Sequence, residues 1–200
     1  MTDEYVTVAG EGHASFGDGG SEFVGYVTGA ASEEEAQGFV DDVRDGHPDA
    51  THHVSAYRVR DAGTVRGIYD DDGEPSGSAG KPVLGVLRGE CTENVVCVVV
   101  RYYGGTKLGY GGLVTAYSRT AKRALEDAGT RKTVPRDEVR VEVGYDDSGT
   151  VRDVLESEDV GYDAEYGEKA VLVARIPTGR ADGVVDRLLS ATSGRARIER

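Results

Sequence analysis

The sequence has few of the residues that staple small proteins together or anchor proteins in membranes. Its 200 residues include no tryptophan, one methionine, five prolines and two cysteines, Cys91 and Cys97. Because Cys97 lies inside the apolar run 95–100, a buried thiol is expected rather than a disulfide framework or a metal site, and neither CxxC nor HExxH occurs. That run is the longest aliphatic stretch and is far too short to span a bilayer. No membrane segment is therefore predicted.

Positive charge is also scarce, with 23 Lys and Arg against 36 Asp and Glu, a formal net charge of −13 and a pI near 4.7. Taken alone, this balance argues against a nucleic-acid partner. The acids are scattered along the whole sequence, which favours a hydrated surface suited to a salt-rich cytoplasm over one acidic binding face. The start of the sequence, Met-Thr-Asp-Glu, has two acids and lacks the basic and apolar regions of a secretory signal, so a cytoplasmic protein is expected.

The first 133 residues have the pattern of a mixed α and β domain. The capping box Ser32-Glu33-Glu34-Glu35 predicts a helix start, and Gly129 is well placed to end the last helix. Periodicity and turn residues predict paired strands 5–9 and 22–28 around the Gly-rich stretch 17–20, a helix to about 45, a strand 53–60, a loop 70–82, a helix 82–87, a buried strand 95–102 and a helix 113–128. The apolar stripe of that last helix comprises Leu113, Tyr117, Ala121, Ala124 and Ala128.

A second domain is predicted over residues 134–200, after a candidate linker at 130–136 that contains Pro135 and no apolar periodicity. The expected elements are a strand 139–143, a helix 149–157, a hairpin of 160–166 and 170–177 turning at Gly167, a helix 180–190 and a strand 195–199. The order βαββαβ predicts a ferredoxin-like module of about 65 residues, a size that can fold alone.

Glycines gather between the buried strand and the helix that follows it, in the stretch GGTKLGYGG over residues 104–112. Free amides at a helix N-terminus attract anions, and glycine lets a ligand approach the backbone. The Walker A motif fails because Tyr110-Gly111 stands where Lys-Ser/Thr is required, and GxGxxG is absent. Two interpretations stay open: a contact with an anion or phosphodiester, supported by Arg101 and Lys107, or tight packing of the helix on the strand.

A compact basic segment stands within this acidic chain. Residues 101–136 contain eight Lys and Arg against two acids, a net charge of +6 that leaves −19 for the rest. Arg119, Lys122 and Arg123 have i, i+3, i+4 spacing and are predicted to share one helical face opposite the apolar stripe. That face is either simply solvated or in contact with a polyanion. Tyr102 and Tyr103 are available for stacking on bases, although packing is their simpler role.

The loop 70–82 contains acids and serines but no recognisable catalytic or calcium pattern. Its acids lack the DxDxDG spacing of a calcium loop, so no metal is expected. Its serines do not lie in GxSxG, and no nucleophile is assigned. His52 and His53 precede a strand whose alternation points one of them inward and one outward, and structural hydrogen bonds are favoured over catalysis.

Two long motifs in order resemble the IMPACT/YigZ family. They are DDGEPSGSAGKP at 71–82 and VVVRYYGGTKLGYGGLV at 98–114, and HPDA at 47–50 with HHVSAYR at 52–58 is similar to an earlier part of the family pattern. The similarity covers roughly residues 20–130, and the second domain resembles the extra domain of prokaryotic members. The basic or polar lead-in usual before the second strand is replaced here by Gly20-Ser21-Glu22-Phe23.

The resemblance implies an α+β fold class. Residues 1–133 would form a ribosomal protein S5 domain-2-like domain, similar to domain four of elongation factor G, and residues 134–200 a small ferredoxin-like domain similar to its domain five. Both parallels point toward RNA or the ribosome, and the acid excess points to a haloarchaeal-type member. Eukaryotic relatives regulate translation initiation with an additional RWD domain that this sequence lacks, so their partner does not transfer. The resemblance brings no established catalytic residue.

The sequence therefore predicts a cytoplasmic, translation-associated regulatory protein that contacts structured RNA, the ribosome or a translation regulator without catalysis, cofactor, metal, membrane or DNA specificity. The predicted binding residues are Asp72, Gly73, Glu74, Ser76, Gly77, Lys81, Arg101, Tyr102, Gly104, Gly105, Lys107, Gly109, Gly111, Gly112, Arg119, Lys122 and Arg123. An enzyme acting on a small phosphorylated substrate is the alternative, and it requires Asp72, Glu74, Lys81, Arg101 and Lys107 to converge on one concave site. A protein-binding module is the third possibility and predicts an exposed apolar patch.

Overall fold

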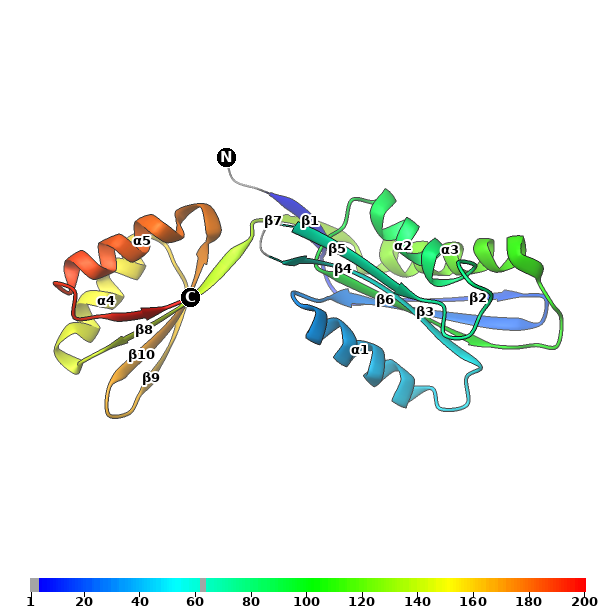
Figure 1. Cartoon of the computed structure of the whole chain (residues 1–200), viewed down its shortest axis with the longest axis horizontal. Coiled ribbons are helices and arrows are strands. Elements are labelled where there is room, and N and C mark those ends of the chain that lie inside the picture. Colours follow the sequence, from blue (N-terminus) through cyan, green and yellow to red (C-terminus); the bar gives the residue numbers. More distant parts are fainter. Residues whose placement is uncertain (1–3, 62–63) are drawn as a thin grey trace. The chain divides into compact units, whose positions relative to one another are not determined.

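The chain forms two compact units, each with its own hydrophobic core (Figure 1). The structure is a computed structural model and describes residues 4–61 and 64–200. The units comprise Tyr5–Thr133 and Val134–Arg200. The predicted α+β class, an N-terminal domain followed by a smaller C-terminal one, is confirmed. Within the described residues, every helix is too short or too polar to cross a bilayer.

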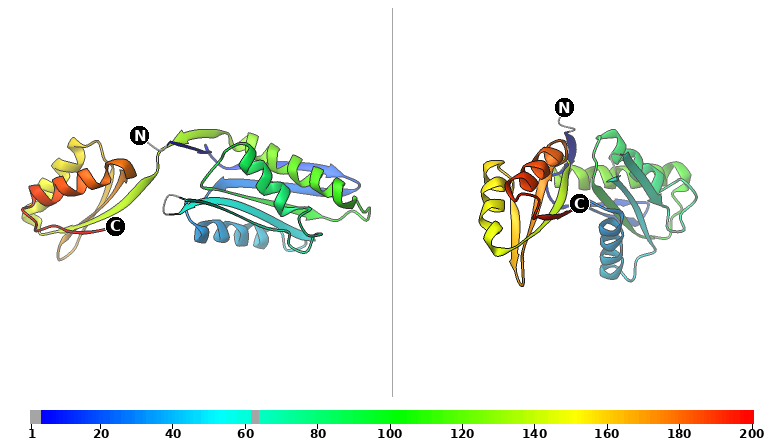
Figure 2. Two further views of the ribbon diagram at one scale, coloured as in Figure 1. Left: turned by 45° about the horizontal axis from the view of Figure 1, so that its top comes forward. Right: turned by 60° about the vertical axis from the view of Figure 1, so that its left-hand side comes forward.

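A five-stranded antiparallel sheet of order β2-β3-β6-β4-β5 forms the centre of the N-terminal unit. Its strands in that order are β2 (Gly12–Asp18), β3 (Ser21–Gly29), β6 (Val95–Tyr102), β4 (His52–Asp61) and β5 (Thr64–Asp70). Helix α1 (Glu33–Gly46) covers one face of the sheet, and α2 (Gly80–Gly89) and α3 (Gly109–Ala128) cover the other (Figure 2).

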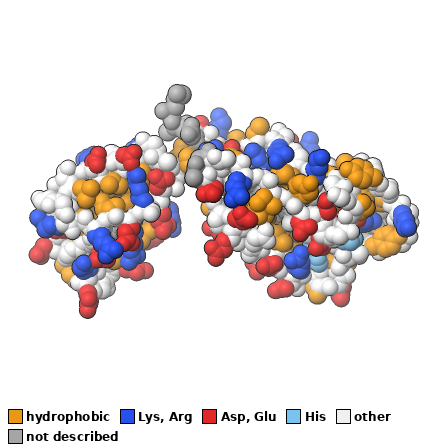
Figure 3. All heavy atoms as spheres, viewed as in Figure 1, with side chains coloured by type: hydrophobic (Ala, Val, Ile, Leu, Met, Phe, Trp, Pro, Cys, Tyr) orange, Lys and Arg blue, Asp and Glu red, His pale blue; other side chains and the backbone are white. Residues whose placement is uncertain are grey.

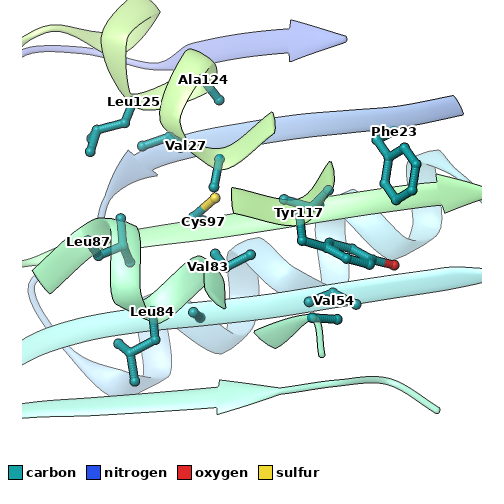
Figure 4. Close-up of a cluster of buried hydrophobic side chains, with 14 of the residues drawn as sticks. Phe23, Val27, Val54, Val83, Leu84, Leu87, Cys97, Tyr117, Ala124 and Leu125 are labelled. Carbon is teal, nitrogen blue, oxygen red and sulfur yellow. The ribbon is translucent and has the colours of Figure 1, made fainter. Parts of the chain in front are cut away.

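Strand β6 is buried on both faces because helices lie on both sides of it. Its even-numbered valines from Val96 to Val100 join the core under α1. Cys97 joins the core under α2 and α3, and Figure 4 shows its sulfur among aliphatic side chains. Burial raises the pKa of the Cys97 thiol to about 12, as expected for a structural thiol. The continuous apolar run at 95–100 is thus a central strand.

The helices of this unit begin and end where their flanking residues dictate. The Ser32 hydroxyl accepts from the Glu35 amide at 3.1 Å, and the Glu35 carboxylate accepts from the Ala31 amide at 2.8 Å, one residue before the usual capping-box partner. Helix α3 begins at Gly109, four residues earlier than predicted, and its whole predicted apolar stripe is buried. Gly129 ends it with a φ of 64°.

The predicted N-terminal hairpin was wrong in its pairing. Strand β3 pairs with β2, which was not predicted, and the turn between them is at Gly19-Gly20. Strand β1 (Tyr5–Val8) instead pairs with β7 (Thr130–Thr133), within the segment predicted as a linker. Strand β5 was also missed. The two missed strands of the five-stranded sheet, β2 and β5, lie at its edges and contain glycine, so their apolar alternation is weak.

The C-terminal unit has the predicted βαββαβ order. It comprises β8 (Arg136–Val143), α4 (Tyr145–Ser157), β9 (Tyr162–Tyr166), β10 (Ala170–Pro177), α5 (Thr178–Ala191) and β11 (Arg197–Glu199). The antiparallel strand order is β11-β8-β10-β9. This is the ferredoxin-like arrangement, in which the two β-α-β halves interleave. Helix α4 begins four residues before the predicted start at 149.

Candidate functional site

The loop between β5 and α2 is ordered by one carboxylate. Asp71 accepts hydrogen bonds from the amides of Gly77 at 2.7 Å, Ala79 at 3.1 Å and Gly80 at 2.8 Å. The N-cap residue of α2, Ala79, has no side chain that can cap the helix. Asp71 therefore satisfies the first free amides of α2 from eight residues upstream and fixes the loop on the helix start.

Asp72 joins this loop to the start of β4. Its carboxylate accepts from the His53 amide at 2.6 Å, and its carbonyl accepts from Nδ1 of His52 at 2.7 Å. The His53 ring lies on the opposite face of the sheet, where Nε2 donates to the His47 carbonyl at 3.0 Å. Both histidines thus hold backbone in place, in agreement with the structural role favoured from the sequence.

A buried ion pair lies beneath the loop. Arg101, 4% exposed, donates from Nη1 to Oε1 of Glu74, 8% exposed, at 2.6 Å, and from Nη2 to the Ser21 hydroxyl at 3.2 Å. The Tyr117 hydroxyl donates to the same Glu74 oxygen at 2.7 Å. Burial, followed by the hydrogen bond to Glu74, raises the pKa of Tyr117 above its usual range. In Figure 4 the Tyr117 hydroxyl points away from the aliphatic cluster around Cys97.

The ion pair and the hydrogen bonds around it connect four parts of the fold. Ser21 begins β3, Glu74 lies in the loop, Arg101 is near the end of β6 and Tyr117 belongs to α3. The Arg101 guanidinium also lies 5.3 Å from the ring centroids of both Phe23 and Tyr103. Two charges buried in this way are stable only while both partners and their hydrogen bonds remain. Glu74 of the first family motif and Arg101 of the second therefore meet at one end of the sheet.

The Gly-rich turn after β6 is shaped by close backbone contact. A Cβ at Gly104 would lie 1.8 Å from the carbonyl oxygen of Gly20, and the Gly104 amide donates to the Ser21 hydroxyl at 3.1 Å. Gly105 and Gly109 have φ values of 90° and 70°, in the left-handed region. Tight packing thus explains Gly104. Gly111 has open space around it, and an anion contact at that glycine stays a prediction.

The predicted basic face of α3 is exposed. Arg119 is ten residues into α3, about 15 Å from its first residue at the helical rise of 1.5 Å per residue. Arg119 and Arg123 lie over the Phe16 ring, whereas Lys122 lines a hollow of about 410 Å³ together with Glu90 and Glu126. The predicted single face is thus divided, with Lys122 beside two acids and the arginines above an aromatic ring.

Every Lys and Arg between residues 107 and 132 is without an acidic partner within 4.0 Å in the part of the chain that the structure describes, namely Lys107, Arg119, Lys122, Arg123, Arg131 and Lys132. Elsewhere among the described residues, the unpaired cations are Arg58, Lys81, Arg88, Arg136, Arg140 and Arg152. In the C-terminal unit, most Lys and Arg form ion pairs, among them Lys169 with Glu142 and Arg180 with Glu158. A protein rich in acid thus leaves one run of its cations available to an external anion.

The five residues required by the enzyme alternative do not form one concave site. Glu74 and Arg101 neutralise each other beneath the loop, while Lys81 and Lys107 are exposed outside it. A hollow of about 380 Å³ in this unit is lined by β1, the end of β3 and Asn94, and none of these five residues lines it. The large hydrophobic side chains that are exposed among the described residues are all tyrosines, and the apolar patch of the protein-binding alternative stays a prediction. The described residues also contain no group of three or more metal-ligating side chains placed to hold an ion.

Several residues of this arrangement were not found from the sequence. Ser21 and Tyr117 complete the buried network, and Phe16 underlies the arginines. Tyr117 was predicted only as part of the apolar stripe, because its spacing carries no sign that its hydroxyl reaches a carboxylate. Tyr102 points to the α1 side, where its hydroxyl lies 2.7 Å from Nδ1 of His47. Ser76 is exposed, and Gly77 accepts a hydrogen bond from the Tyr110 hydroxyl at its carbonyl oxygen.

Fold and site together define a two-domain α+β protein in which a buried polar network orders a Gly-rich turn at the start of a helix with free positive charge. The model of the Impact N-terminal domain matches residues 19–125, and a domain of unknown function, DUF1949, matches residues 141–195. The first match covers more than half of the sequence. The chain belongs to the IMPACT family.

Relatives in bacteria share most of this chain. The IMPACT family member YigZ of Escherichia coli is 40% identical over 126 residues, a match that spans 62% of this chain and 62% of YigZ. An IMPACT family member of Thermus thermophilus is 37% identical over 181 residues, covering 90% of this chain and 97% of that protein. A crystal structure described only as a hypothetical protein has 30% identity and a TM-score of 0.72, covering 99% and 97% of the two chains.

One structure in the comparison is described as the two-domain translational regulator Yih1. It is 24% identical to this chain, covers 61% of it and has a TM-score of 0.35. A likeness of that size does not show a shared arrangement of the whole fold. Its description as a regulator concerns Yih1 itself.

Proposed function

We propose that this protein is a cytoplasmic, translation-associated regulator that binds structured RNA of the translation machinery through α3, without catalysis. The observation that carries the proposal is the run of unpaired cations from Lys107 to Lys132 in a chain of net charge −13. Membership of the IMPACT family supports the link to translation. The proposed contact residues are Gly105, Lys107, Gly109, Gly111, Gly112, Arg119, Lys122 and Arg123.

The distribution of charge supports an approach of RNA from one side. Helix α1 has three glutamates in its first turn and lies on the opposite face of the sheet from α3. In Figure 3, Lys and Arg side chains gather over α2 and α3 of the N-terminal unit, and Asp and Glu side chains gather over α1. An asymmetric charge distribution of this kind orients a polyanion toward the basic side and repels it from the other.

The loop and the buried ion pair have a supporting role in this proposal. Glu74 and Arg101 are too deeply buried to touch a macromolecule, and Asp71 is occupied by three backbone amides. Their network holds Gly104 through Ser21 and α3 through Tyr117, and the N-cap residue of α3, Leu108, makes no side-chain cap to the first amides of the helix. At high salt, electrostatic attraction weakens steeply, and contacts from backbone amides and arginine planes gain in relative importance.

Crosslinking and sequencing of RNA bound in cells tests this function. The variant Arg119→Glu/Lys122→Glu/Arg123→Glu is compared with Arg140→Glu/Arg152→Glu/Arg175→Glu, which changes the net charge by the same amount within the C-terminal unit, outside the basic segment. We expect rRNA or tRNA to be enriched by the wild type and by the control, and the α3 variant to lose the enrichment. Recovery of no such RNA above background, or equal recovery by all three proteins, would overturn the proposal.

A further inference from the structure

Two arginines of α3 stack on one aromatic ring of the neighbouring edge strand. The guanidinium carbon of Arg119 lies 4.6 Å from the ring centroid of Phe16, and that of Arg123 lies 5.5 Å from it. Neither arginine has an acidic partner within 4.0 Å among the described parts of the chain. The ring is half-buried, and its centroid lies 6.4 Å from that of Phe23 in the core. Phe16 is therefore a fixed platform for two free charges.

The close packing of α3 on β2 brings this cluster together. A Cβ at Gly12 would lie 2.1 Å from the carbonyl oxygen of Ala124, and a Cβ at Gly25 would lie 2.9 Å from the Thr120 side chain. Glycine at both positions lets the helix approach the sheet. The sheet register pairs Phe16 with Phe23 on the neighbouring strand, so Phe23 supports the Phe16 ring from within the sheet while the arginines of α3 cover it.

Stacking changes what the arginines can do. Cation–π contact restrains each guanidinium plane yet leaves its N–H groups free, which lowers the conformational entropy lost when a phosphate is bound. A guanidinium offers two parallel N–H donors to a phosphate, whereas a Lys ammonium offers a point charge. Because the arginines cover the Phe16 ring, that ring is not available to stack on a base. The exposed aromatic Tyr110 is at the helix start, nine residues before Arg119 and about 14 Å from it along the helix.

We infer that Phe16, Arg119 and Arg123 form a preorganised clamp for the phosphodiester backbone of RNA, so that α3 binds RNA independently of its base sequence. This inference rests on the proposed function and specifies which part of the RNA is recognised. Phe16 is a positioning residue in the clamp, and the two arginines make the contact. Phosphate contacts position a protein on a nucleic acid without reading its sequence.

The clamp is tested with the full chain and a fluorescent RNA hairpin, by anisotropy over a series of potassium chloride concentrations. Arg119→Lys/Arg123→Lys keeps the charge and removes the planar donors, and Phe16→Leu removes the ring but keeps an apolar side chain. We expect each variant to bind about five- to tenfold more weakly than wild type at moderate salt. Arg140→Lys/Arg152→Lys in the C-terminal unit is the matched control and should bind as wild type. Circular dichroism establishes that the variants are folded, and the double Lys variant leaves the core untouched.

The outcomes separate this inference from the proposed function. A second hairpin of the same shape and permuted sequence should bind within about twofold of the first, because phosphates are common to both. Wild-type affinity of both the double Lys variant and Phe16→Leu, or a strong preference between the two hairpins, would overturn the clamp. If the charge-reversed variant of Arg119, Lys122 and Arg123 then still lost binding, the proposed function would stand without it. Binding that survives charge reversal would overturn both.

Discussion

Replacing Arg101 with methionine should lower the free energy of unfolding of the N-terminal unit by more than substitutions of its exposed residues do. Arg101→Met removes the 2.6 Å ion pair and the hydrogen bond to Ser21, while the Glu74 carboxylate stays buried with Tyr117 as its remaining donor. Breaking a buried pair by removing one partner typically costs about 3–5 kcal/mol. We expect a loss of this size in the free energy of unfolding.

A double-mutant cycle isolates the interaction between the two charges. Glu74→Gln alone leaves the Arg101 charge buried, while the side chain keeps its shape and one accepting oxygen, so it should also be strongly destabilising. Glu74→Gln/Arg101→Met removes both charges at once. The double variant should therefore be less destabilised than the sum of the single variants by at least about 2 kcal/mol.

Urea unfolding of the full chain, followed by far-UV circular dichroism, gives these free energies. The C-terminal unit has its own core and supplies an internal control, because its transition should keep its midpoint in all variants. The coupling should change little with salt, since buried charges are weakly screened. Additive effects to within about 0.5 kcal/mol would refute the reasoning, because they would mean that Glu74 and Arg101 do not stabilise each other.

Two further predictions concern the same unit. Gly104→Ala should destabilise the N-terminal unit by more than about 1 kcal/mol, because the new Cβ would collide with the Gly20 carbonyl. Gly38→Ala in α1 has open space around the new Cβ and should stabilise the unit by roughly 0.5–1 kcal/mol. Thermal unfolding of both variants measures these effects, and equal effects would contradict the prediction. Burial raises the pKa of Cys97 from 9.0 to about 12, so the folded protein retains the thiol proton over this range while the unfolded chain loses it, and stability should fall as pH rises from about 9 toward 12. Cys97→Ala should flatten that dependence of urea midpoints on pH, while alkylation at pH 8 should label exposed Cys91 and spare Cys97; rapid labelling of both thiols in the folded state would show the burial to be wrong.

Local signals in the sequence were sufficient to predict those helices and strands whose position depends on their own residues. The run 95–100 has apolar residues on both faces and forms the central strand β6 with the bounds predicted for it. Ser32 caps α1, and Gly129 ends α3. The order βαββαβ of the C-terminal unit was also predicted from the sequence, because each of its elements has its own periodicity. In each case, the deciding interaction joins residues close in sequence.

The sequence did not indicate which strands far apart in the chain pair with each other. Strand β1 contains four residues, and its partner β7 lies more than 120 residues away, so nothing near either segment indicates the pairing. Position 12 of strand β2 requires glycine because α3 approaches it closely, and not because of a local turn. The predicted single basic face contained residues of the right charge, but only the packing of β2 under α3 separates the arginines over Phe16 from Lys122 beside Glu90.

The sequence by itself determined the family motifs, the α+β class and the existence of a +6 segment within a chain of net charge −13. Those properties depend on composition and local spacing. Only the tertiary structure decided that Glu74 and Arg101 neutralise each other in the interior while the cations from Lys107 to Lys132 remain unpaired. The physical reason is that the effect of a charge depends on its burial and on its partners, and both are set by segments far apart in the chain.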